Sequence, residues 1–262
     1  MNTVIDVLPF SALVIAGFML FVWMLSLILK DASIVDFFWG LGFIAVAAAN
    51  FTKPEAPTNR SVMVLVLTLI WGLRLAVYIY IRNRGKGEDF RYQAMRRKYG
   101  RRFGIVSLFT VFLFQGLILG IVSLPIQISI NAAAPDRLVF FDYFGALVFM
   151  TGWLFETVAD WQLFVFKSDP QNKGLPLQSG LWRYSQHPNY FGESLIWVGL
   201  FIIAFSVHHG ILSIASPLLM FFLLLKVSGI PLLKKQFEKR PAYNEYMSKT
   251  SAFIPMPPKH KA

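Results

Sequence analysis

The feature that most constrains the fold is a series of long apolar runs, separated by short stretches that hold most of the charge. We interpret seven of them as membrane spans, at residues 8–29, 34–52, 61–81, 105–130, 138–166, 190–207 and 210–230. Each is close to or longer than the roughly 17–25 residues that a spanning helix needs. Hydrophobic residues make up 56% of the 262 residues, which is more than soluble domains usually carry. The sequence therefore predicts an all-α polytopic membrane bundle with about seven transmembrane helices in a single domain, residues 1–262.

The distribution of Lys and Arg predicts the orientation of these helices. The predicted loop between the third and fourth runs, "RNRGKGEDFRYQAMRRKYGRR", contains nine Lys or Arg residues. The positive-inside rule places it in the cytoplasm. Alternation then puts the basic C-terminal tail on the same side, so we expect the N-terminus outside and the C-terminus in the cytoplasm. The net charge of +11 is explained by this topology and by contact with anionic lipid, and we expect no nucleic-acid partner.

Several kinds of chemistry are excluded or disfavoured. The chain contains no cysteine, which excludes disulfides, thiolate metal sites and a cysteine nucleophile. No histidine is spaced with a carboxylate on one helical face as in zinc enzymes, so we predict no metal site. The first apolar run lacks a preceding basic segment, and we expect it to be a retained helix and not a cleaved signal peptide.

We single out five ionisable side chains within the predicted spans, where a charge is costly and is therefore a candidate for function. They are Asp36, Arg74, Glu156, Asp160 and Glu193. Structural roles are also open: Asp36 can cap its helix, and Arg74 can pair with Glu156 or Asp36.

The spacing of polar residues predicts one cavity near the cytoplasmic ends of the fifth and sixth runs. Glu156 and Asp160 are four residues apart, as are Asn189 and Glu193, so each pair shares one face of its helix. The connection between the two runs is short enough to bring these faces together. Lys167 lies seven residues after Asp160, and we expect it at the basic rim of the cavity.

The stretch "GLWRYSQHPNYFGES" just before the sixth run concentrates polar and aromatic side chains. Basic groups can hold phosphate, carboxylates and amides can hold a ribose and a carboxamide, and aromatic rings can stack on a flat ring. These groups suit a nucleotide, but the chain has neither GxGxxG nor a Walker loop, so a Rossmann site is not expected. His187 and Pro188 can alternatively serve only to start a helix. The candidate cofactor-binding residues are Glu156, Asp160, Lys167, Arg183, Tyr184, His187, Asn189, Tyr190, Glu193 and Lys234.

A family resemblance rests on the block "GLWRYSQHPNYFGESLIWVG", with "FETVADWQLFVFK" before it and "EYMSKTSAFIP" after it. These segments resemble the steroid 5-alpha-reductase superfamily, and more closely its bacterial branch, a domain of unknown function. The resemblance implies a seven-helix reductase of a bacterial inner membrane, with its cofactor site facing the cytoplasm. Such an enzyme takes NADPH from the cytosol and reduces a carbon–carbon double bond conjugated to a carbonyl in a lipid. By that resemblance, Asp160, Asn189 and Glu193 match positions that hold the cofactor.

The substrate half of the site departs from the family pattern. The steroid reductases bind the substrate carbonyl with a Gln-Glu pair on the second helix and a Tyr on the third, and this chain has neither. It offers Asp36 and Trp39 on the second run, and Trp71 stands where the Tyr would fall. We expect the acid near the carbonyl oxygen to be Tyr78 or a protonated Asp36, with Arg74 as the third candidate catalytic residue. A steroid substrate does not follow from this pattern.

Two other functions remain open. Membrane methyltransferases of the isoprenylcysteine type have a similar "RHPxYxG" block, which makes S-adenosylmethionine-dependent methylation of a lipid or prenyl group the alternative. Those enzymes often carry acidic residues after the last span, whereas "LLKKQFEKR" stands here and favours phosphate, and thus NADPH. A lipid-binding or transport protein would explain buried charge but not the dense polar cluster. For the reductase, we expect a lipophilic substrate that enters from the bilayer, and contact with membrane lipid.

Overall fold

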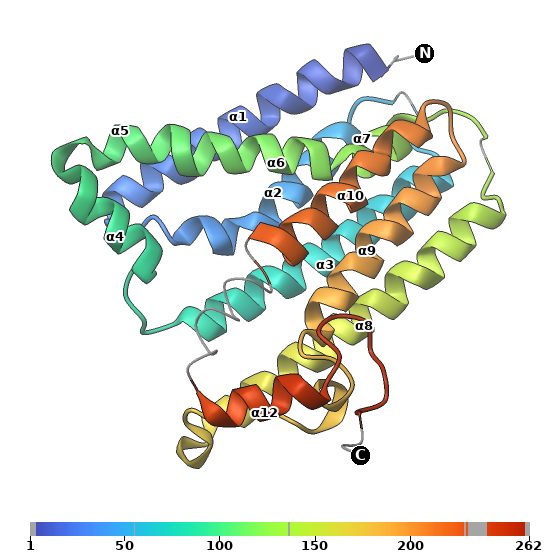
Figure 1. Ribbon diagram of the computed structural model, residues 1–262. Helices are drawn as coiled ribbons and strands as arrows, with labels where there is room; N and C mark the ends of the chain where they lie inside the picture. The colour runs from blue at the N-terminus through green and yellow to red at the C-terminus, as the bar shows by residue number, and fades with distance from the viewer. Residues whose placement is uncertain (1–3, 55, 136, 228, 230–239, 260–262) are drawn as a thin grey trace. The chain divides into compact units, whose positions relative to one another are not determined.

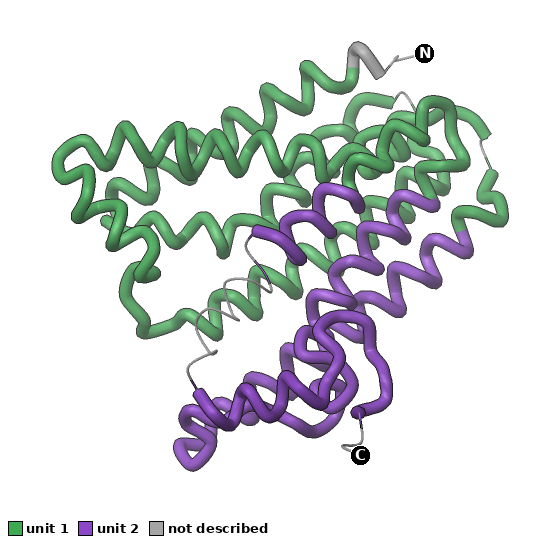
Figure 2. Tube along the Cα trace, in the orientation of Figure 1, with its two compact units in different colours: residues 1–142, 203–216 green, residues 143–202, 217–262 purple. Residues whose placement is uncertain are grey.

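The computed structural model describes residues 4–54, 56–135, 137–227, 229 and 240–259. Within these ranges the chain forms helices and turns and no strand, which confirms the predicted all-α class (Figure 1). Its contacts divide it into two compact units, coloured separately in Figure 2. Unit 1 comprises residues 1–142 and 203–216, and unit 2 comprises residues 143–202 and 217–262.

Six helices of the described residues are long and apolar enough to cross a membrane, and they indicate an integral membrane protein. They are Val7–Leu29, Ile34–Phe51, Asn59–Asn83, Phe90–Val122, Pro188–Phe205 and Gly210–Val227. The fifth predicted span coincides with α8 (Phe140–Ser168), which has 29 residues. It is not among the six because acidic residues lower its mean hydropathy.

Unit 1 is built around the first three helices, α1 (Val4–Leu29), α2 (Ile34–Phe51) and α3 (Asn59–Asn83). The backbones of α2 and α3 touch at two glycines, because a Cβ atom added at Gly40 would lie 2.5 Å from the carbonyl oxygen of Gly72. Small residues of this kind let membrane helices approach closely. The buried rings of Phe43 and Trp71 pack edge to face beside this contact.

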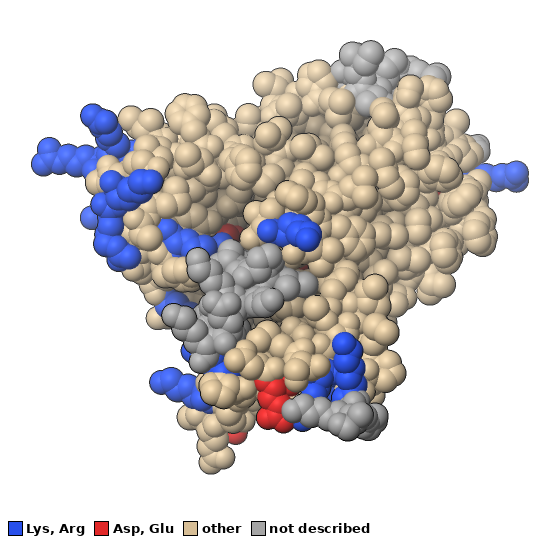
Figure 3. All heavy atoms as spheres, viewed as in Figure 1, with Lys and Arg blue, Asp and Glu red and all other residues tan. Residues whose placement is uncertain are grey.

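The segment after α3 differs from its prediction in two ways. Much of the expected basic loop is helical, forming α4 (Phe90–Tyr99) and the 3₁₀ turn η1 (Gly100–Arg102). The expected single span at 105–130 is divided into α5 (Phe103–Ser107), the π-helical η2 (Leu108–Leu113), α6 (Phe114–Val122) and α7 (Leu124–Asn131). The break falls at Ser123, just before Pro125, whose ring nitrogen has no hydrogen to donate to the preceding turn. Figure 3 shows one group of Lys and Arg side chains over α4 and the start of α5, with others at separate places on the same face.

Helix α4 is tied to the turn between α1 and α2 through Glu88. The Glu88 carboxylate accepts hydrogen bonds from Arg96 Nη2 at 2.8 Å and from the backbone N–H of Ala32 at 2.9 Å. Burial alone would raise the pKa of Glu88, but the hydrogen bonds from Arg96 and Ala32 outweigh it and lower that pKa. Arg96 also donates to the Lys30 carbonyl at 3.3 Å, so one acidic side chain joins two connections that lie far apart in the sequence.

An ion pair that the sequence analysis missed joins the starts of α3 and α8. Arg60 donates through Nε and Nη2 to the two carboxylate oxygens of Asp142, each at 2.7 Å. Both side chains are buried, 1% and 0% exposed. The remaining groups are also used, since Arg60 Nη1 donates to the Pro135 carbonyl and the Val139 N–H donates to Asp142. Arg60 is therefore a buried structural residue of unit 1.

Unit 2 contains most of α8, α9 (Pro188–Phe205) and the connection between them. The connection includes two short 3₁₀ turns, η3 (Pro170–Asn172) and η4 (Gly180–Arg183). The later elements are α10 (Ala215–Phe222), which begins at the end of unit 1, the π-helical η6 (Leu223–Val227) and α12 (Pro241–Lys249). The last apolar span also includes the 3₁₀ turn η5 (Gly210–Ile214), which belongs to unit 1.

Candidate active site

Helix α8 carries a stripe of polar side chains on one face. Trp153, Glu156, Thr157 and Asp160 follow one another at intervals of three, one and three residues, which places them on the same side of a helix. Glu156 and Asp160 are buried, 3% and 4% exposed. Buried carboxyl groups in a largely apolar helix are costly and indicate a candidate functional site.

Helix α9 completes this cluster through Asn189 in its first turn. Asn189 Nδ2 donates a hydrogen bond to Asp160 Oδ1 at 3.1 Å, so the two faces meet as the spacing predicts. The other amide atom, Asn189 Oδ1, is buried and has no hydrogen-bond partner. Glu193 lies one turn further along α9 and is half-buried. Trp153 Nε1 and Thr157 Oγ1 on α8 also lack a hydrogen-bond partner.

The two helices come this close because glycines line their contact. A Cβ atom at Gly152 would lie 2.5 Å from the Gly192 carbonyl oxygen, and one at Gly199 would lie 2.6 Å from that of Gly145. The pairing of 152 with 192 and of 145 with 199 shows that α8 and α9 run antiparallel. Each run contains two glycines seven residues apart, and this spacing is the sequence signal of the contact.

The connection between α8 and α9 folds back on α8. Trp182 is buried, and its Nε1 donates to the Ala159 carbonyl at 3.0 Å. The Leu181 N–H donates to the side chain of Gln162 at 3.0 Å. Gly180 adopts a φ of 60° directly against Gln162, a position where a side chain would be strained and would collide with it. These contacts fix the segment that leads to His187.

His187 is buried just before α9, with 7% of its surface exposed. Burial lowers its pKa to about 4, so the imidazole is neutral at pH 7. Its ring stacks on Tyr190 at a centroid distance of 5.3 Å and an angle of 12°. Its Nδ1 has no hydrogen-bond partner, and this nitrogen is therefore a further polar group that a ligand can use.

The C-terminal segment packs against this same connection, a contact that sequence reasoning did not foresee. The Tyr246 hydroxyl of α12 donates to the carbonyls of Trp182 and Ser185, and burial raises the pKa of this phenol. The side chain of Gln186 donates to the Thr250 carbonyl at 2.7 Å, and its backbone N–H donates to the Ser251 carbonyl at 2.8 Å. The region before α9 is thus held from both sides, by α8 and by the chain's end.

The basic candidates lie at the exposed margin of unit 2. Lys167 and Arg183 are exposed, and Tyr184 has 42% of its surface exposed. Lys234 lies outside the described residues, so its prediction stays untested. Among the residues that the structure describes, no three His, Asp or Glu side chains are grouped so as to hold a metal ion.

The three predicted catalytic residues belong to unit 1. Arg74 and Tyr78 lie one turn apart on α3, both half-buried, and the Arg82 guanidinium lies 5.5 Å from the centre of the Tyr78 ring. Asp36 stands in the first turn of α2, and its carboxylate oxygen is 3.5 Å from Arg91 Nη2 of α4. The sequence analysis did not single out Arg91.

The unit 2 cluster fits the polar part of a nucleotide cofactor. It offers unpartnered groups of both kinds, with Asn189 Oδ1 as an acceptor and Trp153 Nε1 as a donor, and Thr157 Oγ1 can act as either. Ribose hydroxyls and a carboxamide have matching donors and acceptors. The exposed Lys167 and Arg183 are suited to phosphate. The site residues are therefore compatible with the expected NADPH.

Comparisons with known proteins give one family and two relatives. The model of a family described as a protein of unknown function, DUF1295, matches residues 22–250. An uncharacterised protein of Schizosaccharomyces pombe is 24% identical over 287 residues, which cover 94% of this chain and 80% of the yeast protein. A probable O-methyltransferase, ustE, of Ustilaginoidea virens is 33% identical over 100 residues, 38% of this chain and 34% of that protein. No solved structure gives a significant match.

Proposed function

The chain belongs to the DUF1295 family, and on that premise we propose that it is a membrane-embedded, NADPH-dependent reductase of a carbon–carbon double bond in a lipophilic substrate. The substrate class is a steroid-like or isoprenoid lipid enone. The observation that carries the proposal is the buried cluster on α8 and α9, in which Asn189 binds Asp160 at 3.1 Å while its own Oδ1 is left unpartnered. The resemblance to steroid 5-alpha-reductases assigns the cofactor to these positions.

Each side chain of the cluster has a role that follows from its surroundings. Asp160 fixes the Asn189 amide, so that Oδ1 is presented as an acceptor for a donor group of the cofactor. The neutral His187, stacked on Tyr190, keeps one ring nitrogen for a ligand. Burial in an apolar helix pair makes each hydrogen bond to the cofactor stronger than it would be in water. The basic margin, with Lys167 among its residues, would hold the phosphates.

The bound cofactor supplies a hydride, and the chain must supply an acid for the carbonyl oxygen of the enone. Asp36 is already engaged by Arg91, whose Nη2 lies 3.5 Å from its carboxylate oxygen. Tyr78 is better suited, because its half-buried phenol has the positive Arg82 near its ring, which stabilises negative charge as the proton leaves. Arg74, one turn away, would orient the polar end of the substrate. Without such groups, an apolar bundle would leave the negative charge of the developing enolate unstabilised.

A second function, S-adenosylmethionine-dependent methylation of a lipid or prenyl group, is favoured by one specific observation. The probable O-methyltransferase of Ustilaginoidea virens matches part of this chain. The acidic side chains of the buried cluster, Glu156 and Asp160, would suit the positive charge of that cofactor. The match covers only 38% of the chain, so methylation remains the alternative.

The experiment that separates these functions is a thermal-shift titration of the detergent-purified protein with NADPH, NADH and S-adenosylmethionine. A ligand that binds only the folded state stabilises it by about 2.7 kcal/mol at 100 times its Kd. We expect NADPH alone to raise the melting temperature, and Asn189→Ala to weaken this effect at least tenfold in concentration. Asn244→Ala is the matched control, because Asn244 is an exposed residue of α12. Stabilisation by S-adenosylmethionine alone would replace the reductase with the methyltransferase.

A further inference from the structure

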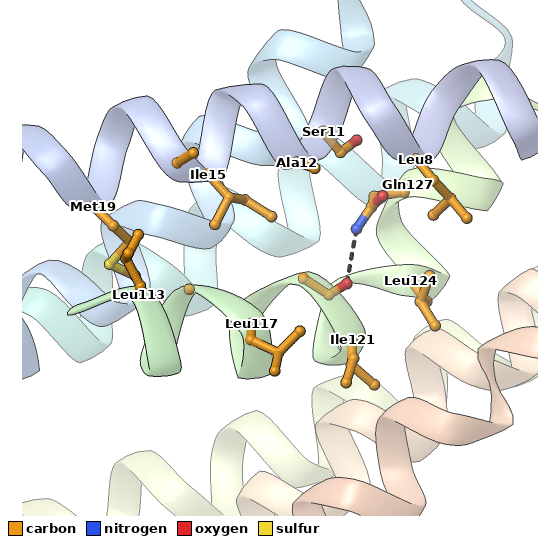
Figure 4. Close-up of a pocket in the computed structure, with 13 residues that line it drawn as sticks. Leu8, Ser11, Ala12, Ile15, Met19, Leu113, Leu117, Ile121, Leu124 and Gln127 are labelled. Carbon is orange, nitrogen blue, oxygen red and sulfur yellow. Dashed lines mark hydrogen bonds between the residues drawn. The ribbon is translucent and has the colours of Figure 1, made fainter. Parts of the chain in front are cut away.

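A cavity in unit 1 is lined by none of the candidate catalytic or cofactor-binding residues. This cavity of about 380 Å³ runs between α1 on one side and η2, α6 and α7 on the other (Figure 4). This volume lies within the roughly 300–1,000 Å³ of small-molecule sites. Its walls are apolar and include Leu8, Ile15, Met19, Leu117 and Ile121. Leu8 and Met19 are eleven residues apart, about 16 Å along a helix, so the cavity is long and suits an extended chain.

One end of this cavity is polar because Gln127 of α7 lies there (Figure 4). Gln127 is buried, 1% exposed. Its Nε2 donates to Ser123 Oγ at 2.7 Å and to the Gly120 carbonyl at 3.0 Å. Both amide hydrogens are therefore used, which fixes which amide atom is oxygen. The oxygen, Oε1, has no hydrogen-bond partner, although it lies among apolar helices where an unpaired acceptor is costly.

A buried hydrogen-bonded network behind Gln127 holds this end in place. The Asn131 side chain donates to the backbone carbonyl of Gln127 at 2.9 Å and to Asn50 Oδ1 at 2.8 Å. Asn50 Nδ2 in turn donates to Ser11 Oγ, a residue of the cavity wall, at 2.9 Å. The Gln127 amide itself is held by the two hydrogen bonds of Nε2 to Ser123 and Gly120, so its oxygen cannot exchange places with the nitrogen without losing both.

From these contacts we infer that the cavity binds a linear apolar molecule that ends in a hydroxyl group, with the O–H donating to Gln127 Oε1. The acyl chains of ordinary phospholipids do not meet this need, since their ester oxygens are acceptors only and cannot pair with another acceptor. A long-chain alcohol supplies both the extended apolar body and the missing donor. This site does not depend on the proposed reductase activity.

The test compares two isomeric probes, of which only one has a hydrogen-bond donor. Detergent-purified protein is titrated with decan-1-ol and with its isomer nonyl methyl ether, and the melting temperature is followed. One hydrogen bond predicts that the alcohol acts at a concentration about two- to tenfold lower than the ether. Gln127→Leu should remove this difference. Equal action of the two probes on the wild-type protein would overturn the inference, and this comparison requires no variant to fold.

A second pair of variants tests the apolar part without touching the Gln127 network. Ala12 lies on the cavity wall, so Ala12→Phe should fill the space and abolish stabilisation by decan-1-ol. Ala48→Phe is the matched control, because both alanines are exposed on helices of unit 1 and Ala48 does not line the cavity. Decan-1-ol that stabilises Ala12→Phe as well as it stabilises Ala48→Phe would place the alcohol elsewhere and overturn the inference. NADPH titration of the same variants should be unchanged.

Discussion

The contact between α8 and α9 makes a sharp prediction for Gly192→Ala. The added Cβ atom would lie 2.5 Å from the backbone nitrogen of Glu156 and 2.6 Å from the Gly152 carbonyl oxygen. Both are backbone atoms of α8 and cannot rotate away as a flexible side chain could. To restore an ordinary contact of about 3.5 Å, the helices must separate locally by about 1 Å.

The expected size of the effect follows from two opposing contributions. Overpacking costs about 1–3 kcal/mol, whereas replacing a helical glycine by alanine returns about 0.5–1 kcal/mol. The net loss of about 1–2 kcal/mol corresponds to a melting temperature lower by roughly 2–8 °C for a protein of this size. The hydrogen bond from Asn189 to Asp160 is 3.1 Å long, and a separation of about 1 Å would break it. The variant should therefore also lose affinity for NADPH.

Thermal unfolding in detergent, with and without NADPH, measures both effects. Gly17→Ala is the control, because no atom lies within 4 Å of a Cβ added there, and it should be neutral or slightly stabilising. A Gly192→Ala protein that melts with the wild type would refute the close packing of α8 and α9. Normal NADPH affinity in a destabilised variant would refute the assignment of the cofactor to Asn189 and Asp160.

Two further predictions concern buried charge. Arg60→Met should destabilise the protein by about 3–5 kcal/mol, because it leaves Asp142 buried and unpaired. In thermal unfolding, the double variant with Arg60→Met and Asp142→Leu should recover most of that loss. A double variant that is no more stable than the single one would contradict this prediction. The folded-state pKa of His187 is about 4, below its usual 6.5, so the unfolded chain binds a proton first as the pH falls. Stability should therefore decrease from pH 6.5 to pH 4 by on the order of 3 kcal/mol, and unfolding midpoints of His187→Gln should lack this component.

Hydropathy predicts the membrane helices well because every spanning segment must be apolar and must pair its own backbone polar groups. It does not report where a helix breaks. The run at 105–130 is uniformly apolar, yet it divides at Ser123, because Pro125 cannot donate the hydrogen bond that a continuous helix needs. The density of charge in the basic stretch before it predicts a loop, although Phe90–Tyr99 forms a helix.

The candidate site was predictable only where its residues are close in sequence. The four-residue spacing of Glu156 and Asp160, with a short connection to Asn189, was enough to predict that these faces meet. Arg60 and Asp142 are 82 residues apart, and no local pattern pairs them. The contact of Tyr246 with Trp182, 64 residues away, is a consequence of the tertiary fold in the same way.

Unpaired polar atoms indicate a ligand more strongly in a membrane protein than in a soluble one. On a soluble protein, water can satisfy a buried acceptor near the surface, but hydrocarbon offers it no donor. Among the described residues, atoms of this kind gather at α8 and α9, as with Thr157 and Asn189, and at α7, as with Gln127 and Asn131. The first group combines donors and acceptors beside carboxylates and suits a nucleotide, whereas at the cavity end of the second the unpaired atom is the acceptor of Gln127 and suits a hydroxyl. If NADPH binds the polar atoms of α8 and α9 and decan-1-ol binds Gln127, then the two ligands should raise the melting temperature additively. Each ligand should also stabilise a variant that no longer binds the other ligand as well as it stabilises the wild type.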